Sequence, residues 1–130
     1  MANTMQFDLV SPERKLASLE IAEIEIPGSE GDFTVMPDHA AVLTTLRPGI
    51  LKVTSGNEVT EYVVTGGFVE VSGTALSVLA EQAIPRADVT REFVENLVAV
   101  AETAAENLHG AELDLASKRV ADTKALLETM

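Results

Sequence analysis

Histidine, cysteine and serine motifs are the first places to look for chemistry in this chain of 130 residues, and they are sparse. His39 and His109 are the only histidines, no cysteine occurs, and neither histidine stands in an HExxH or His-x-His pattern. An imidazole or thiolate metal site is therefore not expected. A GxSxG nucleophile motif and a Walker A loop are also missing, and Gly66-Gly67 precedes Phe68-Val69-Glu70 without a lysine. We interpret these glycines as a tight turn or a close approach of two strands.

Carboxylates are the abundant reactive groups, and their pattern indicates solvation rather than catalysis. The chain has 21 Asp plus Glu against 9 Lys plus Arg, a net charge of -12. Glu23 and Glu25 alternate with Ile24 and Ile26, which is typical of the wet face of a strand and not of an acid–base pair. The negative charge disfavours nucleic acid and direct lipid binding. We expect no catalytic residue, no metal and no cofactor.

The residues up to Pro85 predict an all-β domain. Short runs with strand character alternate with Gly, Pro, Asn and Ser, and Gly56-Asn57 has the composition of a hairpin turn with positive φ. A sandwich or flattened barrel of eight strands follows from this pattern. The expected strands cover residues 5–10, 15–26, 33–36, 41–46, 49–54, 59–65, 67–72 and 75–80.

Beyond Pro85 the apolar period changes from two to about 3.6, which predicts two helices. Glycine at His109-Gly110 is expected to end the first helix and to let the two helices pair antiparallel. The predicted fold is mainly β plus α: an antiparallel β-sandwich in domain 1–85, then a helical hairpin in domain 86–130. The expected apolar stripes are Phe93, Leu97, Val100, Ala101, Ala104 and Leu108 in the first helix, and Leu113, Ala116, Val120 and Leu127 in the second.

One longer stretch carries a family resemblance. Residues 30–49 read EGDFTVMPDHAAVLTTLRPG. They closely resemble the epsilon subunit of F-type ATP synthases, whose pattern runs roughly EGEFGVLPGHAPLLTxLKPG. Other matches keep the order that they have in the family: VSPE at 10–13, GGFVEV at 66–71 and VLAE at 78–81. The specific motifs cover about residues 5 to 85, and the remainder resembles the family by architecture.

The resemblance implies a β-sandwich followed by a helical hairpin, in a non-catalytic subunit of the central stalk. Such subunits bind the gamma subunit and the c-ring, and couple proton flow to ATP synthesis. By analogy, the loop of Glu30, Gly31 and Asp32 faces the c-ring and the segment around His39 packs near gamma. The start MANTMQFDLV lacks a basic flank followed by an apolar run, so we expect no presequence. We also expect a peripheral position on the cytoplasmic face of a bacterial inner membrane, without direct insertion.

The loop chemistry follows as a hypothesis. Gly31, Pro37 and Pro48-Gly49 give the loop one backbone shape. Glu30 and Asp32 would then orient the subunit by pairing with basic groups of the ring. His39 is expected to hold the loop by a structural hydrogen bond, with direct partner contact as the alternative. The chain has Asp38 and Ala41 where the family commonly has glycine and proline, which affects the loop conformation.

The hairpin resembles relatives that inhibit ATP hydrolysis or bind ATP, but only in part. An ATP site would involve Asp88, Arg91 and Arg119, by similarity to a DxxRA motif, yet Glu92 stands where alanine is expected. Residues 86–130 carry five basic and nine acidic groups, a balance of 5 - 9 = -4. The resemblance implies the α/β head as a further partner through the C-terminal helices. An inhibitory helix would benefit from positive charge against acidic stator loops, so the negative balance predicts weak or absent inhibition by the hairpin.

Two other classes remain as alternatives. A stand-alone β-sandwich module for sugar or peptide needs an aromatic platform, and the chain has one tyrosine, Tyr62, and four phenylalanines. A cupin-type enzyme needs a histidine-rich metal set. Neither alternative explains the helical hairpin, and co-purification with gamma distinguishes a rotor subunit from both.

Overall fold

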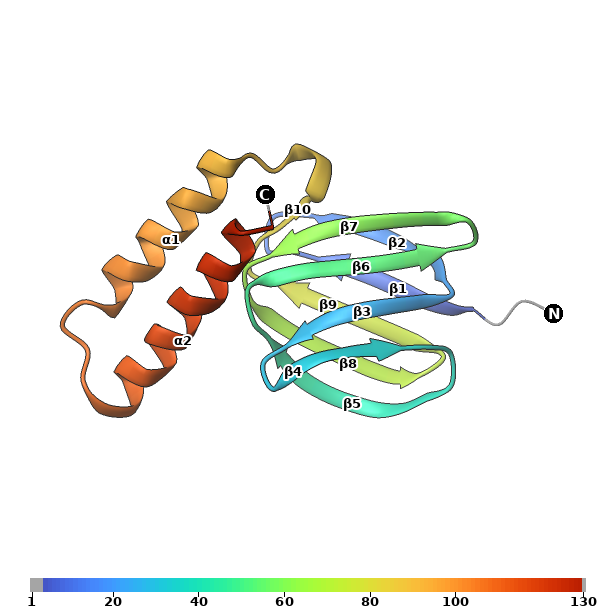
Figure 1. The fold of residues 1–130 in the computed structure, drawn as a ribbon. Coiled ribbons are helices and arrows are strands. Elements are labelled where there is room, and N and C mark those ends of the chain that lie inside the picture. The colour runs from blue at the N-terminus through green and yellow to red at the C-terminus, as the bar shows by residue number, and fades with distance from the viewer. Residues whose placement is uncertain (1–3, 130) are drawn as a thin grey trace. The chain divides into compact units, whose positions relative to one another are not determined.

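The structure, a computed structural model, describes residues 4–129 apart from the side chain of His39. The chain divides into two compact units, Met1–Ala87 and Asp88–Met130. The first is a β-sandwich and the second is a pair of helices (Figure 1). The predicted fold class is confirmed.

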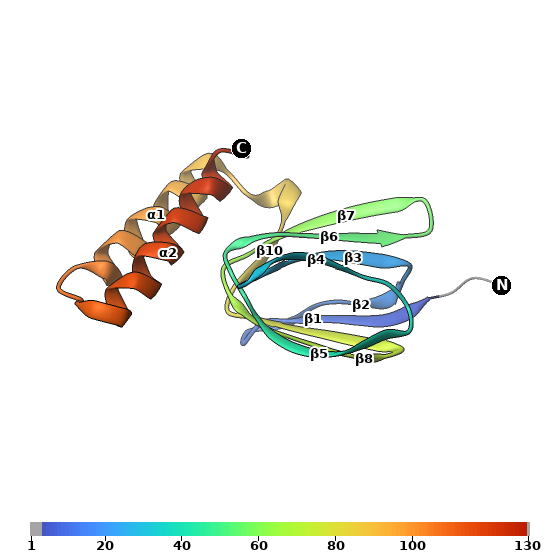
Figure 2. The ribbon, with the colours of Figure 1, turned by 60° about the horizontal axis from the view of Figure 1, so that its bottom comes forward.

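Ten strands form the sandwich as one hydrogen-bonded path. The order is β10-β7-β6-β3-β5-β8-β9-β1-β2, with β4 paired to β3. The path folds into two layers, with β10, β7, β6, β3 and β4 facing β5, β8, β9, β1 and β2 (Figure 2). Neighbouring strands are antiparallel except β1 and β9, which are parallel. The strands are β1 (Met5–Val10), β2 (Lys15–Ile21), β3 (Glu23–Gly28), β4 (Gly31–Val35), β5 (His39–Leu46), β6 (Gly49–Ser55), β7 (Glu58–Val64), β8 (Gly67–Gly73), β9 (Ala75–Ala80) and β10 (Ala83–Pro85).

The single strand predicted over residues 15–26 is wrong, because the chain changes layer there. β2 pairs with β1 in one layer, whereas β3 pairs with β4 and β6 in the other. Ile21 and Ile24 are both fully buried, which two residues three apart on one flat strand cannot be, since side chains alternate between faces. The break falls at Ala22, whose N–H donates to the Thr54 carbonyl at 2.8 Å.

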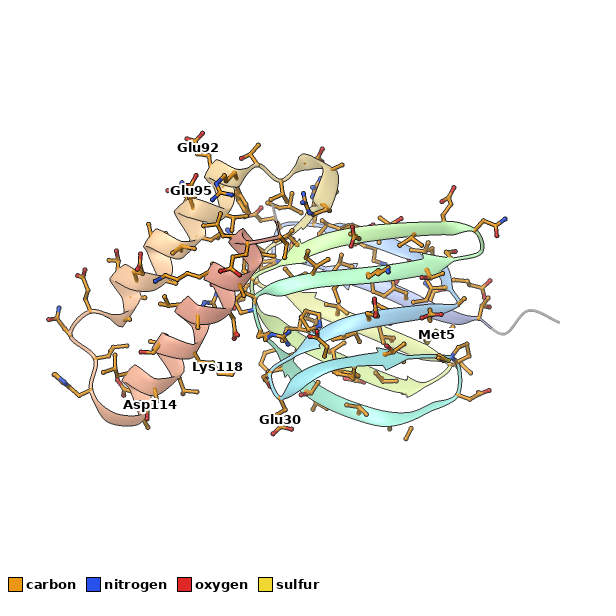
Figure 3. The ribbon with its side chains drawn as sticks, in the orientation of Figure 1. Met5, Glu30, Glu92, Glu95, Asp114 and Lys118 are labelled. Carbon is orange, nitrogen blue, oxygen red and sulfur yellow. The ribbon has the colours of Figure 1, made fainter. Side chains whose placement is uncertain are left out.

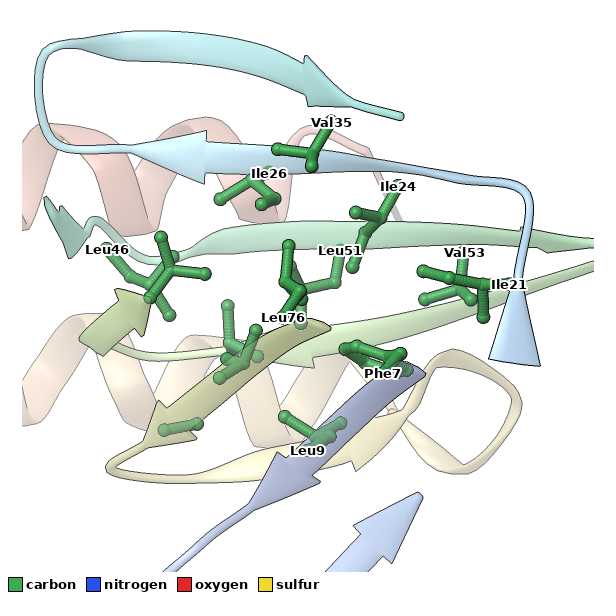
Figure 4. Close-up of a cluster of buried hydrophobic side chains, with 14 of the residues drawn as sticks. Phe7, Leu9, Ile21, Ile24, Ile26, Val35, Leu46, Leu51, Val53 and Leu76 are labelled. Carbon is green, nitrogen blue, oxygen red and sulfur yellow. The ribbon is translucent and has the colours of Figure 1, made fainter. Parts of the chain in front are cut away.

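The sandwich core lies between the layers. Figure 4 shows large apolar side chains from both layers pointing into one space. Burying each such side chain contributes about 1.5–3 kcal/mol, so this cluster dominates the stability of the unit. The members exposed by 1% or less include Met5, Phe7, Leu9, Ile21, Ile24, Ile26, Val35, Leu51 and Leu76.

The helices are α1 (Arg91–Ala105) and α2 (Gly110–Leu127), preceded by a short 3-10 turn, η1 (Arg86–Asp88). Thr90 caps α1 by accepting from the Phe93 N–H at 3.1 Å. The predicted helix end at His109-Gly110 is wrong. Asn107 takes the left-handed conformation (φ 66°) after α1 has ended, and Gly110 begins α2.

The helices pair antiparallel, as predicted, and Lys124 of α2 lies 3.5 Å from Glu102 of α1. The buried residues of the helices are Val94, Val98 and Ala101 in α1, and Thr123 and Leu126 in α2. Val100, part of the predicted stripe, is instead 66% exposed. The alanine-rich sequence supports more than one helical stripe, and the periodicity did not select the buried one.

Candidate partner-binding site

The turn between β3 and β4 presents the acidic loop that the sequence singled out. Gly28 and Gly31 face each other across the hairpin, and a side chain on Gly28 would lie 2.7 Å from the Gly31 carbonyl oxygen. Gly31 has φ of 137°, which L side chains rarely adopt. Glu30 lies exposed at the tip and points away from the strands (Figure 3).

Arg47, at the end of β5, holds this turn in place. Its Nη1 donates to the Gly28 carbonyl at 2.9 Å, and its Nη2 forms an ion pair with the Asp32 carboxylate. Its backbone N–H donates to the Pro27 carbonyl at 3.0 Å. Asp32 is therefore engaged within the chain, which leaves Glu30 as the tip carboxylate that makes no ion pair with a described residue.

Two further hydrogen bonds tie the turn to β5. The Ser29 N–H donates to the Thr45 carbonyl at 2.9 Å, and the Thr45 hydroxyl donates to the Ser29 hydroxyl at 2.7 Å. Sequence reasoning missed Arg47, although it is the only Lys or Arg within residues 30–49. A lone cation in an acidic stretch was the available signal.

His39 lies far from the Glu30 turn. It begins β5 opposite Gly73, whereas Leu46 at the other end of β5 pairs with Gly28. At about 3.3 Å per residue the two ends of the strand are roughly 20 Å apart. The structure therefore does not bring His39 together with the turn, and its side chain lies outside the described part of the chain.

A shallow apolar depression of about 320 Å³ opens on the outer face of the β5-β8-β9-β1-β2 layer. Phe68, Leu79 and Val10 form one row across β8, β9 and β1. The lining comes from three segments that carry the sequence resemblance: Val10, Ser11 and Pro12; Gly67 and Phe68; and Leu79, Ala80 and Glu81.

Exposure of large apolar side chains marks this face. Phe68 and Leu79 are 55% and 54% exposed, and Leu43 on β5 is 72% exposed. Phe68 and Leu79 are direct partners across β8 and β9, whereas Leu43 stands opposite Glu70. Exposed apolar surface such as the Phe68–Leu79 pair is typical of a protein-binding site. Sequence reasoning missed these residues, although Phe68-Val69 and Val78-Leu79 are adjacent apolar pairs, and in a strand one member of such a pair must point outward.

The turn and the depression lie at the same end of the sandwich. Gly28, Leu46, Gly67 and Ala80 are successive partners across β3, β5, β8 and β9. Gly67 confirms the predicted close approach, because a Cβ there would lie 2.0 Å from the Leu79 carbonyl oxygen. One rigid end of the sheet therefore positions both surfaces.

The residues suggested for ATP lie in or beside the helical unit. Asp88 ends η1, Arg91 begins α1 and Arg119 lies on α2, all with exposed side chains. The lysines of α2 pair with acids of the same unit: Lys118 lies 2.9 Å from Asp122, and Lys124 pairs with Glu102. The structure provides no cluster of unpaired lysines on α2 for a phosphate.

Asp8 lies in a small polar cluster on β1 and β2. The pKa of Asp8 is lowered, mainly by the Ser18 side chain opposite it on β2, with further contributions from Gln6 and Lys15. Within residues 4–129 no group of three or more His, Asp or Glu residues is arranged to hold a metal ion. No helix in that range is long and apolar enough to cross a bilayer.

Comparison with known proteins gives the family. The sequence model described as "ATP synthase, Delta/Epsilon chain, beta-sandwich domain" matches residues 4–86. The ATP synthase epsilon chain of Rhodobacter capsulatus is 52% identical over 126 residues, covering 97% of this chain and 96% of the relative. The chain belongs to the ATP synthase epsilon-chain family. The epsilon chain of Ruegeria sp. is 53% identical over 132 residues with the same coverage.

Solved structures share the fold of this epsilon-family chain. A chain in the Euglena gracilis mitochondrial ATP synthase, in a structure of OSCP, F1 and c-ring, has a TM-score of 0.75 at 22% identity, covering 98% of this chain and 81% of that chain. A chain from the Tetrahymena thermophila mitochondrial ATP synthase central stalk and c-ring has a TM-score of 0.67 at 21% identity, covering 96% and 94%. Family membership, shown by the relatives at 52% and 53% identity, favours a subunit of the synthase over the stand-alone binding module.

Proposed function

We propose that this chain is a non-catalytic central-stalk subunit of a proton-translocating F-type ATP synthase. It would turn with the rotor and couple proton flow to ATP synthesis, from a peripheral position on the cytoplasmic face of a bacterial inner membrane. The observation that carries this proposal is the convergence of three family motifs on one exposed apolar depression. This convergence supports a surface that binds a partner rather than a reaction centre.

The gamma subunit is the proposed occupant of the apolar face. Phe68 and Leu79 are aligned across β8 and β9 and provide large contact area on a stiff sheet. Leu43 is a further exposed apolar side chain on β5, closer to the end where His39 lies, and Glu70 stands opposite it. A gamma subunit that covers this layer would reach the segment around His39.

The c-ring is the proposed partner of the Glu30 turn. Gly31 sets the backbone of the turn, and Glu30 presents the outward carboxylate. Asp32 acts inside the chain through Arg47, so its role is to shape the turn. An exposed carboxylate contributes only about 0–1 kcal/mol to a pair, which suits orientation more than affinity.

The helical hairpin, residues 86–130, is proposed to inhibit ATP hydrolysis weakly or not at all. Its charge balance is negative, and Lys118 and Lys124 are paired within the unit. The same pairing, together with Glu92 after Arg91, argues against an ATP site at Asp88, Arg91 and Arg119. No cofactor is needed for the proposed role.

Binding to isolated gamma tests the docking surface. Phe68→Ser and Leu79→Ser are each expected to weaken binding of the full chain by at least about tenfold, the usual effect of truncating a central apolar anchor. Val59→Ser is the matched control, because Val59 is equally exposed (54%) but pairs with Thr54 in the other layer. Equal loss for all three variants, or no loss for Phe68→Ser and Leu79→Ser, would refute the assigned surface.

A further inference from the structure

We propose that Arg47 is the positioning residue of the Glu30 turn: it neutralises Asp32 and fixes the backbone so that Glu30 alone is presented to a cationic group of the rotor partner. This inference rests on the proposed function, because it assumes that the turn meets a partner. It goes further by assigning different roles to the two carboxylates of one loop.

Arg47 lies where β5 ends beside the Glu30 turn. The residue follows β5, whose last residue, Leu46, pairs with both Gly28 and Gly67. Its side chain is only 25% exposed, whereas that of Asp32 is 70% exposed. The guanidinium therefore approaches the turn from the body of the sandwich, and the carboxylate folds back onto it.

The guanidinium of Arg47 makes two contacts with the Glu30 turn. One guanidinium nitrogen donates to the Gly28 carbonyl and the other donates to the Asp32 carboxylate. Arg47 therefore joins the two ends of the turn that has Glu30 at its tip. A planar guanidinium presents its donors in a fixed fork, which lysine cannot reproduce. Loss of this fork frees both the backbone at Gly28 and the Asp32 carboxylate.

The partner would meet a turn in which only the Glu30 carboxylate is uncompensated. Asp32 is compensated by Arg47, and Glu30 makes no ion pair with a described residue. The turn then offers one negative charge at one position. Without Arg47 it would offer two carboxylates on a less constrained loop, which weakens the match to a single lysine or arginine.

A double-mutant cycle tests the inference. The affinity of the full-length chain for a purified gamma–c-ring assembly is measured for Glu30→Gln, Arg47→Met and the double variant. Each single variant is expected to lose about two- to fivefold, the range for an exposed charge pair. The double variant is expected to lose no more than either alone, because both changes abolish the same contact.

Two further variants separate positioning from general stability. Asp32→Asn, at an exposed site, is expected to weaken binding in the same direction without lowering the melting temperature, and Arg47→Lys is expected to be intermediate. Lys52→Met is the control, because it removes the exposed ion pair of Lys52 with Glu25 (3.8 Å) and leaves the turn intact. Binding by this control is expected to match the unmodified chain.

The outcomes distinguish the inference from the function beneath it. Additive losses in the double variant, or full affinity of Arg47→Met beside weakened Glu30→Gln, would overturn the positioning role of Arg47 alone. Failure of the unmodified chain to bind the gamma–c-ring assembly would overturn the proposed function, and the inference with it. The inference would be supported if the two single variants and the double variant lose affinity equally, and if added salt reduces all of these losses to the same extent.

Discussion

The β-sandwich and the helical hairpin are stabilised by different kinds of side chain. The sandwich buries Phe7, Leu51 and a set of isoleucines and leucines from both layers. The hairpin buries valines, an alanine, a threonine and one leucine. We expect the sandwich to be the more stable unit, because it buries more and larger apolar side chains than the hairpin.

The difference matters for function because a docking surface needs a fixed shape. Both proposed surfaces, the apolar depression and the Glu30 turn, lie on the sandwich and share the row from Gly28 to Ala80. In the hairpin, Val100 and Leu115 are 66% and 73% exposed. These side chains lie on the unit that we expect to be less stable. The sandwich is therefore the part suited to hold a partner-binding surface in a fixed shape.

Truncation of the two cores gives the largest expected contrast. Leu51→Ala is expected to lower the free energy of unfolding of the sandwich by about 2–5 kcal/mol, because Leu51 is fully buried. Val98→Ala is expected to cost the hairpin about 1–2 kcal/mol, since fewer buried methyl groups are lost. Denaturant unfolding followed by hydrogen exchange in each unit measures both. A similar cost for both variants would refute the contrast.

Crowding at Gly67 is the next largest effect. Gly67→Ala is expected to destabilise the sandwich by about 2–4 kcal/mol, because the new Cβ meets the Leu79 carbonyl and φ is +134°. Gly56→Ala is the control, with φ of +59° and no atom within 4 Å, and its expected cost is about 1 kcal/mol. Thermal unfolding of the two variants compares them, and equal costs would show that contact with β9 is not the cause.

Replacement of the buried Thr123 is expected to stabilise the hairpin. Thr123 is buried, and its hydroxyl donates to the Arg119 carbonyl at 2.7 Å within α2. Thr123→Val is expected to stabilise the hairpin by about 0.5–1 kcal/mol, because a methyl group replaces a buried hydroxyl whose acceptor lies in the helix ladder. Thr103→Val, at an exposed site of α1, serves as the control. A loss of helical signal in Thr123→Val would contradict this account.

The smallest expected changes in stability come from one glycine substitution in each unit. Asp38 and Asn107 are the non-glycine residues with positive φ in the described chain, at 67° and 66°. Asp38→Gly and Asn107→Gly are each expected to stabilise by up to about 1 kcal/mol, because left-handed strain is relieved at some cost in unfolded-state entropy. Melting temperatures report the change, and a decrease in either would indicate that the native side chain makes a stabilising contact there.

The sandwich was predictable because its signals are local and strong. Alternation at Glu23 to Ile26 and the Gly56-Asn57 hairpin were read correctly, with Gly56 taking the positive φ. The layer change at Ala22 was not predicted, because it depends on which distant strands pair. The hairpin was harder, since alanine fits either side of a helix and Asn107 replaced the expected glycine.

The candidate site was predictable only in part. The motifs at residues 10–13, 66–71 and 78–81 were recognised separately, but their convergence depends on the parallel pairing of β1 with β9. Glu30 was placed at an exposed turn as expected, whereas the hydrogen bond that Arg47 donates to Asp32 joins residues fifteen positions apart. Such contacts follow from tertiary structure, and spacing alone does not reveal them.

Add-back to coupled membrane vesicles stripped of their epsilon subunit tests the central claim most directly. ATP synthesis and ATP hydrolysis are recorded with the full chain and with residues 1–87, which contain the sandwich unit. We predict that both forms restore synthesis equally and that hydrolysis does not differ between them. Failure of both forms to restore synthesis would contradict the rotor assignment, and a several-fold rise in hydrolysis with the shorter form would show that the hairpin is an inhibitor.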